Sequence, residues 1–323
     1  MTTVRRNSLE QDLQLIRKRP DGYYMPIFAQ GGGSKIFWSY AGRTRAAAQA
    51  AVRQMHQPTK PAAGLPPAEK KRFVRLLCNF RAAESAAFNQ KSKIGFYTDY
   101  PWRFSGANRD NPTAELFDAG GLRYEFIQSE QILAGDMRQY AAIFCPGGFG
   151  YFLNAAMGHR FREYVRAGGG LFGFCAGAFF PLKNFLGLCA SSFAYFREQG
   201  FADVLLHPRD PLAAGIAGSP ARVCYALYPQ PAFLRSYTIR IKMKRCNGPL
   251  LIPRGRDVAA AWFDSTEKFS PIIRANYGRG RVVLVSPHPD AGMAEILKTT
   301  GEANLMANLK LFKNIALFCA GCG

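Results

Sequence analysis

The stretch from Gly168 to Ala178 restricts the fold more than any other part of the chain. Three consecutive glycines lead into an apolar run that contains Gly173-Phe-Cys175-Ala-Gly177. An apolar run that ends in Gly-x-Cys-x-Gly is typical of a buried strand that turns sharply into a helix, with the cysteine at the turn. Such a turn strains the backbone of its central residue and needs small neighbours, which Gly173 and Gly177 provide.

Cys175 has two interpretations at such a turn. As a nucleophile, it would gain from the positive dipole end of the following helix, which favours thiolate over thiol. As a structural residue, it would be a buried and inert thiol, which is a common state of free cysteine. The motifs before and after the turn are needed to choose between them.

Short apolar runs alternate with helical patterns from Lys93 onward. Helices are predicted at 112–119, closed by two glycines, and at 156–166. Strands are predicted at 94–98, 122–127, 141–145, 171–174, 258–263, 271–275 and 281–285. This alternation predicts an α/β fold with a mostly parallel sheet that helices cover on both faces.

We expect three parts along the chain. Residues 1–60 form a small basic extension, with predicted strands at 23–29 and 35–40 and a helix at 45–56. Residues 61–91 are a linker and a helix, and residues 92–323 are the main domain. The strand–strand–helix pattern resembles small DNA-binding modules of the plant ethylene-response type. A basic structural appendage is the alternative.

The charge is unevenly distributed. The chain has a net charge of +20, and its first 90 residues carry 15 Lys/Arg against 5 acids. An excess of this size favours contact with nucleic acid or another polyanion, for which residues 1–60 are the candidate segment. Solubility alone is the alternative explanation.

The cysteines and the chain start indicate a cytoplasmic protein. No apolar run approaches the roughly 20 residues that span a bilayer, so no membrane partner is expected. The arginine-rich start leaves organelle targeting open, although Glu10, Asp12 and Asp21 argue against it. Eight cysteines without a disulfide framework indicate reduced thiols. They are Cys78, Cys145, Cys175, Cys189, Cys224, Cys246, Cys319 and Cys322.

No metal or cofactor is predicted. Cys319-Ala-Gly-Cys322 has CxxC spacing but no second pair, so we expect a frayed tail after the last helix. The four histidines have no close cysteine–acid cluster, and the phosphate-loop motif is missing from the sequence.

A loop with two glycines lies upstream of the turn. Gly147 and Gly148 follow the predicted strand at 141–145. Ligands of open α/β sheets bind at the carboxyl ends of the strands, so this loop is expected beside Cys175. The backbone N–H groups of Gly148 and Ala176 are the predicted pair of oxyanion donors.

A histidine and an acid lie downstream of the turn. Ser-Pro-His288-Pro-Asp290 directly follows the predicted strand at 281–285. His288 is predicted to deprotonate Cys175, with Asp290 orienting the imidazole. Each motif is common alone, and their order carries more information than any one of them.

That order resembles class I glutamine amidotransferase-like domains, and in detail the biotin-protein ligase N-terminal-like family. The resemblance lies in residues 143–148, 162–178 and 277–290, within a region of roughly 92–318. It implies a doubly wound, flavodoxin-like sheet and a triad of Cys175, His288 and Asp290. It implies no particular reaction.

Two positions depart from the pattern of that superfamily. Glutaminases carry glutamine in Gly-x-Cys-x-Gly-x-Gln, whereas this chain has Phe179, which cannot hydrogen-bond a substrate amide through its side chain. Asp290 replaces the usual glutamate and is shorter by one methylene. The Phe179 departure puts glutamine as the substrate in doubt, and the Asp290 departure bears on the reach of the acid to His288.

The sequence predicts a cysteine-dependent hydrolase or amidotransferase-like enzyme. Its reaction would cleave an amide C–N bond of a small-molecule or peptide substrate that the sequence does not assign. The alternative is a catalytically inactive amidotransferase-like protein with a binding or regulatory role and a nucleic-acid-contacting N-terminus.

Overall fold

The computed structural model describes most of the chain from Lys93 onward and short pieces before it. The described residues are 14, 16–19, 22–27, 37–42, 44–46, 49, 72, 74–76, 78, 93–98, 112–147, 155–194, 199–216, 219–220, 237–246, 248–264, 268–289 and 293–322.

A three-stranded antiparallel sheet lies near the N-terminus. It consists of β1 (Arg17–Arg19), β2 (Gly22–Ile27) and β3 (Phe37–Gly42) in that order. β2 and β3 overlap the strands predicted at 23–29 and 35–40, and β1 was not predicted. The described residues within 45–49 and 72–78 are helical, whereas the proline-rich linker lies outside the described residues. The predicted part boundaries and the polyanion contact of residues 1–60 stay predictions.

Five parallel strands form one half of the main sheet. In spatial order they are β5 (Tyr124–Ile127), β4 (Ile94–Tyr97), β6 (Ala142–Cys145), β7 (Gly170–Phe174) and β15 (Gly280–Val285). Numbered along the chain, this order is 2-1-3-4-5, which is the flavodoxin-like order. The predicted α/β class is confirmed. Because these five strands are parallel, their carboxyl ends all lie at one edge of the sheet.

The other half of the ten-stranded sheet is antiparallel. It continues from β15 through β14 (Ile272–Tyr277), β13 (Val258–Phe263), β9 (Gln199–Leu206), β11 (Ile239–Cys246) and β10 (Ser219–Pro220). The tight turn at Gly278-Arg279 reverses the chain between β14 and β15, which makes that pair antiparallel. Among the described strands, parallel pairing is therefore confined to β5, β4, β6, β7 and β15. β8 (Ser192–Ala194) and β12 (Leu250–Ile252) form a separate antiparallel pair.

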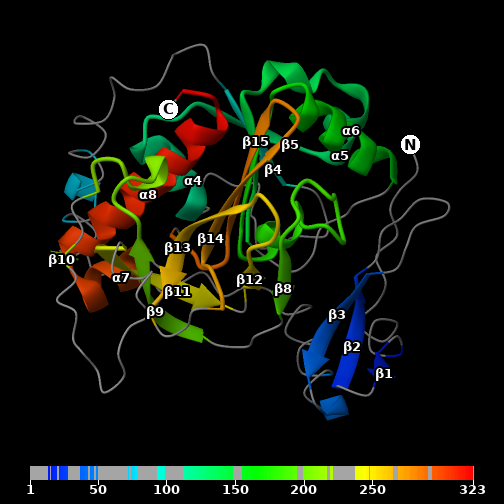
Figure 1. The fold of residues 1–323 in the computed structure, drawn as a ribbon, viewed down its shortest axis with the longest axis horizontal. Helices are drawn as coiled ribbons and strands as arrows, with labels where there is room; N and C mark the ends of the chain where they lie inside the picture. The colour runs from blue at the N-terminus through cyan, green and yellow to red at the C-terminus, as the bar shows by residue number, and fades with distance from the viewer. Residues whose placement is uncertain are drawn as a thin grey trace.

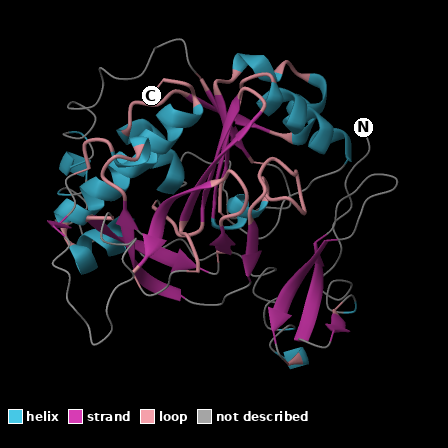
Figure 2. Ribbon diagram, in the orientation of Figure 1, coloured by secondary structure: helices cyan, strands magenta, loops and turns pink. Residues whose placement is uncertain are grey.

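Helices pack on both faces of the parallel strands (Figures 1 and 2). α4 (Pro112–Ala119) and α8 (Glu302–Cys319) share one hydrophobic cluster with β4, β6 and β7, and α5 (Ser129–Ala134) and α6 (Ala155–Arg166) share the other. Successive residues of β6 alternate between the clusters, since Phe144 lies in the first and Ile143 and Cys145 in the second. A further helix, α7 (Met293–Thr300), precedes α8. Among the described helices, none has the length and apolarity that spanning a bilayer requires.

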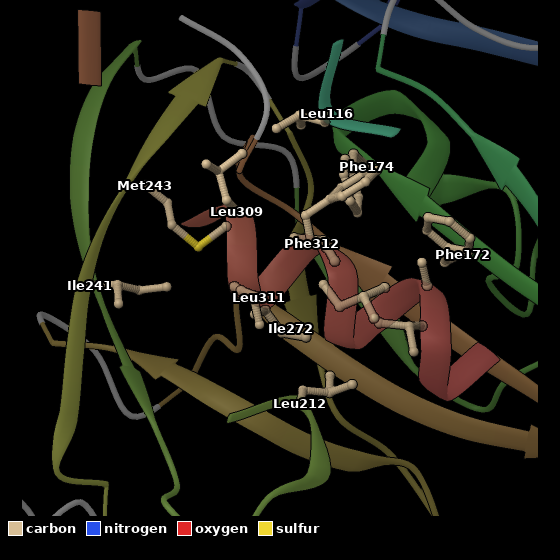
Figure 3. Packing of buried hydrophobic residues seen from close by; sticks show 14 of the residues in the cluster. Leu116, Phe172, Phe174, Leu212, Ile241, Met243, Ile272, Leu309, Leu311 and Phe312 are labelled. Atoms are coloured by element: carbon tan, nitrogen blue, oxygen red, sulfur yellow. The ribbon is translucent and has the colours of Figure 1, made fainter. Parts of the chain in front are cut away.

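Aromatic packing holds β7 against α8 (Figure 3). The ring of Phe312 lies 5.7 Å from that of Phe174 and 6.5 Å from that of Phe172. Phe144 of β6 lies 5.0 Å from both β7 rings. Burying one such side chain stabilises the fold by roughly 1.5–3 kcal/mol. This cluster therefore secures the strand that leads into Cys175.

The last helix, α8, extends further toward the C-terminus than the sequence predicted. Cys319 lies inside α8, is 1% exposed, and its Sγ is 3.7 Å from the carbonyl oxygen of Leu171. The predicted frayed tail is thus wrong at Cys319, because the apolar stripe of α8 continues to that residue. Cys322 is exposed.

Candidate catalytic site at Cys175 and His288

Cys175 occupies the sharp turn at the end of β7. Its φ is +49°, and it is the only non-glycine residue in the described part of the chain with a positive φ. Residues with side chains rarely adopt this left-handed region, and such strain gathers at functional sites. The residue is 7% exposed and begins the short 3₁₀ helix η3 (Cys175–Phe179).

Gly173 and Gly177 allow the backbone to approach itself closely at this turn. A Cβ at Gly173 would lie 2.1 Å from the carbonyl oxygen of Gly177, and a Cβ at Gly177 would lie 2.0 Å from that of Cys145. Real Cβ atoms do not come this close to backbone oxygens. The turn is therefore packed on the end of β6 through main-chain atoms.

The helix expected after Cys175 is only the five-residue η3. Pro181 follows it closely, and proline has no N–H with which to extend a helical hydrogen-bond ladder. The dipole of so short a helix contributes little to stabilising a thiolate at Cys175. The first N–H groups of a helix have no partner within it, which leaves the N–H of half-buried Ala176 available at the start of η3.

His288 reaches the same edge of the sheet. β15 pairs in parallel with β7, and its last residue Val285 lies opposite Phe174. The chain beyond each strand therefore emerges at the carboxyl edge. His288 is half-buried, and its backbone N–H donates a 2.7 Å hydrogen bond to the carbonyl oxygen of Lys244.

Gly147 lies close to both the His288 imidazole and the Cys175 side chain. A Cβ on Gly147 would lie 2.3 Å from Cε1 and 3.1 Å from Nε2 of His288, and 3.2 Å from Cβ of Cys175. The imidazole and Cβ of Cys175 thus both lie within 3.2 Å of one point. The structure brings together Gly147, Cys175 and His288, and the absence of a side chain at position 147 makes room for both.

Two predicted members of the site, Gly148 and Asp290, lie outside the described residues. The second oxyanion donor and the acid of the triad therefore stay predictions.

Three other cysteines are poor candidates for a nucleophile. Burial raises the pKa of the Cys145 and Cys319 thiols far above the ordinary value. Burial, with the negative charge of Asp257 beside it, raises the pKa of Cys189 to about 12. These thiols stay neutral near pH 7.

No group of three histidine, cysteine or acidic side chains that could hold a metal ion occurs within the described residues.

Phe179, at the end of η3, belongs to a small aromatic group. Its ring is half-buried and lies 4.8 Å from that of Phe193, edge to face, and 6.1 Å from that of Phe185. This group presents carbon surface at the position where the superfamily pattern has an amide side chain.

Sequence reasoning missed the contribution of β11. Lys244 of β11 forms an antiparallel backbone bridge with His288. Gly248, just after β11, also packs closely on the histidine segment, because a Cβ there would lie 2.1 Å from the carbonyl oxygen of Ser286. Alternation of apolar and basic residues along 239–244 is typical of a strand and could have revealed β11. Nothing local in the sequence predicts its pairing with the histidine segment.

Several solved structures are similar to this fold. The PurLQS structure from Thermotoga maritima is 14% identical with a TM-score of 0.49, covering 71% of this chain and 99% of the matched chain. A glutamine amidotransferase from the same organism is 12% identical with a TM-score of 0.41, covering 72% and 99%. A β-galactosidase from Rahnella is 12% identical with a TM-score of 0.44, covering 70% and 31%. These likenesses assign no reaction to the chain.

No protein-family model and no curated protein matches the chain.

Proposed function

We propose that the protein is a cysteine-dependent hydrolase or amidotransferase-like enzyme that cleaves an amide C–N bond. One observation carries the proposal: the His288 imidazole and Cβ of Cys175 lie 2.3 Å and 3.2 Å from the position that a Cβ of Gly147 would occupy. The strained φ of Cys175 supports it. A nucleophile beside a base on a strained turn is the arrangement that covalent acyl transfer requires.

The reaction would proceed through a thioester. His288 takes the proton of Cys175, and the thiolate attacks the amide carbonyl carbon. The N–H groups of Ala176 and Gly148 hold the oxyanion while Asp290 orients the imidazole. The C–N bond breaks as His288 returns the proton to the departing amine. Water, activated by His288, then cleaves the thioester and releases the acid.

The same proposal includes a closer relationship with the biotin-protein ligase N-terminal-like family. The order of the Gly-Gly loop, the cysteine turn and the His-Pro-acid segment supports it, as does a parallel half-sheet with helices on both faces. We propose that the domain is doubly wound, with helices on both faces of its parallel strands.

Phe179 and its aromatic neighbours favour a substrate other than glutamine. Their rings offer apolar contact and no hydrogen bond to a carboxamide side chain. We therefore expect the acyl side of the substrate to carry an aliphatic or aromatic group.

The test uses p-nitrophenyl acetate, an activated acyl donor, with a variant that lacks the exposed thiols of Cys78 and Cys322 as the reference protein. We expect a burst of p-nitrophenolate, an acetyl group on the Cys175 peptide by mass spectrometry, and continued slow turnover. Cys175→Ala should abolish all three signals, and His288→Asn should slow the burst by about 10²-fold or more.

Acetylation of Cys175 at the same rate in the His288→Asn variant would overturn the proposal. An acetyl group found on other cysteines but not on Cys175 would do so as well.

A further inference from the structure

The main chain of His288 is anchored on β11. β15 ends three residues before the histidine. The N–H of Ser286 donates a 2.8 Å hydrogen bond to the carbonyl oxygen of Pro271, but Pro287 has no N–H to donate. The N–H of His288 then donates a 2.7 Å hydrogen bond to the carbonyl oxygen of Lys244. The place of the imidazole therefore depends on where β11 runs.

This anchor lies on the outer edge of β11, which is the edge that faces away from β9. In an antiparallel strand, the N–H and C=O groups of successive residues point alternately to one edge and to the other. Lys242 and Lys244 are two residues apart, so their main-chain groups point to the same edge. β10 pairs with this edge at Ile239 and Arg240. Lys242 therefore lies between the part that β10 covers and the part that holds His288.

Asn304 of α8 binds the outer edge at Lys242. Its Oδ1 accepts a 2.7 Å hydrogen bond from the Lys242 N–H, and its Nδ2 donates a 2.9 Å hydrogen bond to the Lys242 carbonyl oxygen. One side-chain amide thus pairs with both main-chain groups, as the backbone of a neighbouring strand would. Asn308 lies one turn further along α8, is fully buried, and donates a 3.0 Å hydrogen bond to the same oxygen.

The helix α8 supports both members of the candidate catalytic pair. Its Phe312 packs on Phe174 of β7, the strand that leads into Cys175. Met243 of β11 belongs to the same hydrophobic cluster as Phe312 (Figure 3). Asn304, about two turns before Phe312, binds the strand that anchors the histidine. One helix therefore holds the cysteine strand by apolar contact and the histidine strand by hydrogen bonds.

We propose that Asn304 is a positioning residue for His288. Its two hydrogen bonds hold the outer edge of β11, so that the Lys244 carbonyl oxygen, about 7 Å further along the strand, meets the His288 N–H. The inference rests on the proposed function, because it takes His288 as the base of Cys175. It adds a residue that touches neither of them and acts through the backbone of β11.

The test measures the rate at which iodoacetamide alkylates Cys175 in the full-length protein, from the Cys175 peptide by mass spectrometry, at several pH values. Asn304→Ala removes both hydrogen bonds at a half-buried position. Asn304→Asp keeps the size of the side chain but sets a second oxygen against the Lys242 carbonyl oxygen, and the two acceptors repel each other. This second variant serves if Asn304→Ala does not fold.

Asn314→Ala is the matched control. Asn314 also lies on α8 and is buried, and its Nδ2 donates 2.9 Å and 2.8 Å hydrogen bonds to the carbonyl oxygens of Leu212 and Ala214. Neither acceptor belongs to β11. The control therefore removes an amide from the same helix without a change at the outer edge of β11.

At about pH 7, we expect both Asn304 variants to slow alkylation of Cys175 by about fivefold or more, because a displacement of about 1 Å in a catalytic pair can cost roughly 10²-fold. At about pH 9.5 the thiol ionises without a base, so the rates of the variants and of the unmodified protein should agree within about twofold. Asn314→Ala should lower the urea midpoint but leave the alkylation rate within about twofold at both pH values.

Folded Asn304 variants that react within about twofold of the unmodified rate at about pH 7 would overturn the proposal. It would also be overturned by an equal slowing in Asn314→Ala, or by a slowing in the Asn304 variants that persists at about pH 9.5, because Asn304 would then only support the fold. The proposed function fails separately, when His288→Asn leaves the alkylation rate of Cys175 unchanged.

Discussion

A single methyl group at position 147 is expected to separate the His288 imidazole from Cys175. In Gly147→Ala the new Cβ would lie 2.3 Å from Cε1 of His288. An ordinary carbon–carbon contact is about 3.5–4.0 Å, so the methyl group and the imidazole must move apart by roughly 1 Å or more. The imidazole moves more readily than the loop, because a side-chain torsion is softer than the backbone.

A displacement of about 1 Å in a catalytic pair can lower a rate by roughly 10²-fold. We therefore expect alkylation of Cys175 by iodoacetamide at neutral pH to fall by that order in Gly147→Ala. The assay quantifies the alkylated Cys175 peptide over time by mass spectrometry, with the unfolding midpoint in urea measured in parallel to confirm that the variant folds.

Gly158→Ala is the matched control. Gly158 lies in α6, and the nearest atom to a Cβ there is Nη1 of Arg162 at 3.4 Å. In this variant, iodoacetamide should alkylate Cys175 at the same rate as in the unmodified protein. The reasoning would be refuted if Gly147→Ala folds and its Cys175 is alkylated at the same rate as in the unmodified protein. His288 would then play no part in activating the thiol.

Three further predictions concern stability. Gly158→Ala should stabilise the fold by about 0.5–1 kcal/mol in urea unfolding, because alanine loses less backbone entropy in a helix, and a destabilisation would contradict the ordinary contact distances of 3.4 Å and more at that position. Phe312→Ala should cost about 3–5 kcal/mol by the same measurement, and a cost below about 1 kcal/mol would mean that Phe312 does not secure β7. Burial raises the folded-state pKa of the thiols of Cys145, Cys189 and Cys319. The unfolded chain then loses these protons first, so stability should hold below about pH 8.5 and fall above it, by up to about 1.4 kcal/mol per pH unit for each thiol. Midpoints of urea unfolding between about pH 7 and 10 that do not fall would oppose this account.

Elements with strong local signals were predicted from the sequence with accurate bounds. Pro112 at the first position and two glycines after Ala119 predicted α4, and the apolar run at 258–263 predicted β13. The order of three motifs also placed Cys175 and His288 after neighbouring parallel strands, and both lie close to Gly147 in the structure, whereas their catalytic roles stay predictions. These features depend on residues that are neighbours in sequence or on a topology common to open α/β sheets.

In the antiparallel half of the sheet, β13 and β14 were predicted as strands, but β9, β10 and β11 were not. Four of the eight β11 residues are basic, and the pairing of β11 with β9 joins segments far apart in the chain. The bridge between Lys244 and His288 depends on that pairing, so its importance became visible only in three dimensions. The shortness of η3, in contrast, follows from Pro181, which a stricter use of local rules would have recognised.

The most direct test of the central claim is the pH dependence of Cys175 alkylation in the unmodified protein and in His288→Asn. A thiol without a neighbouring base loses thiolate about tenfold per pH unit below its ordinary value of about 8.5. We predict that the iodoacetamide rate of the unmodified protein falls by less than about tenfold between about pH 8.5 and 6.5, and that the rate of His288→Asn falls by about 50-fold or more. Identical pH profiles for the two proteins would contradict a nucleophile–base pair at Cys175 and His288.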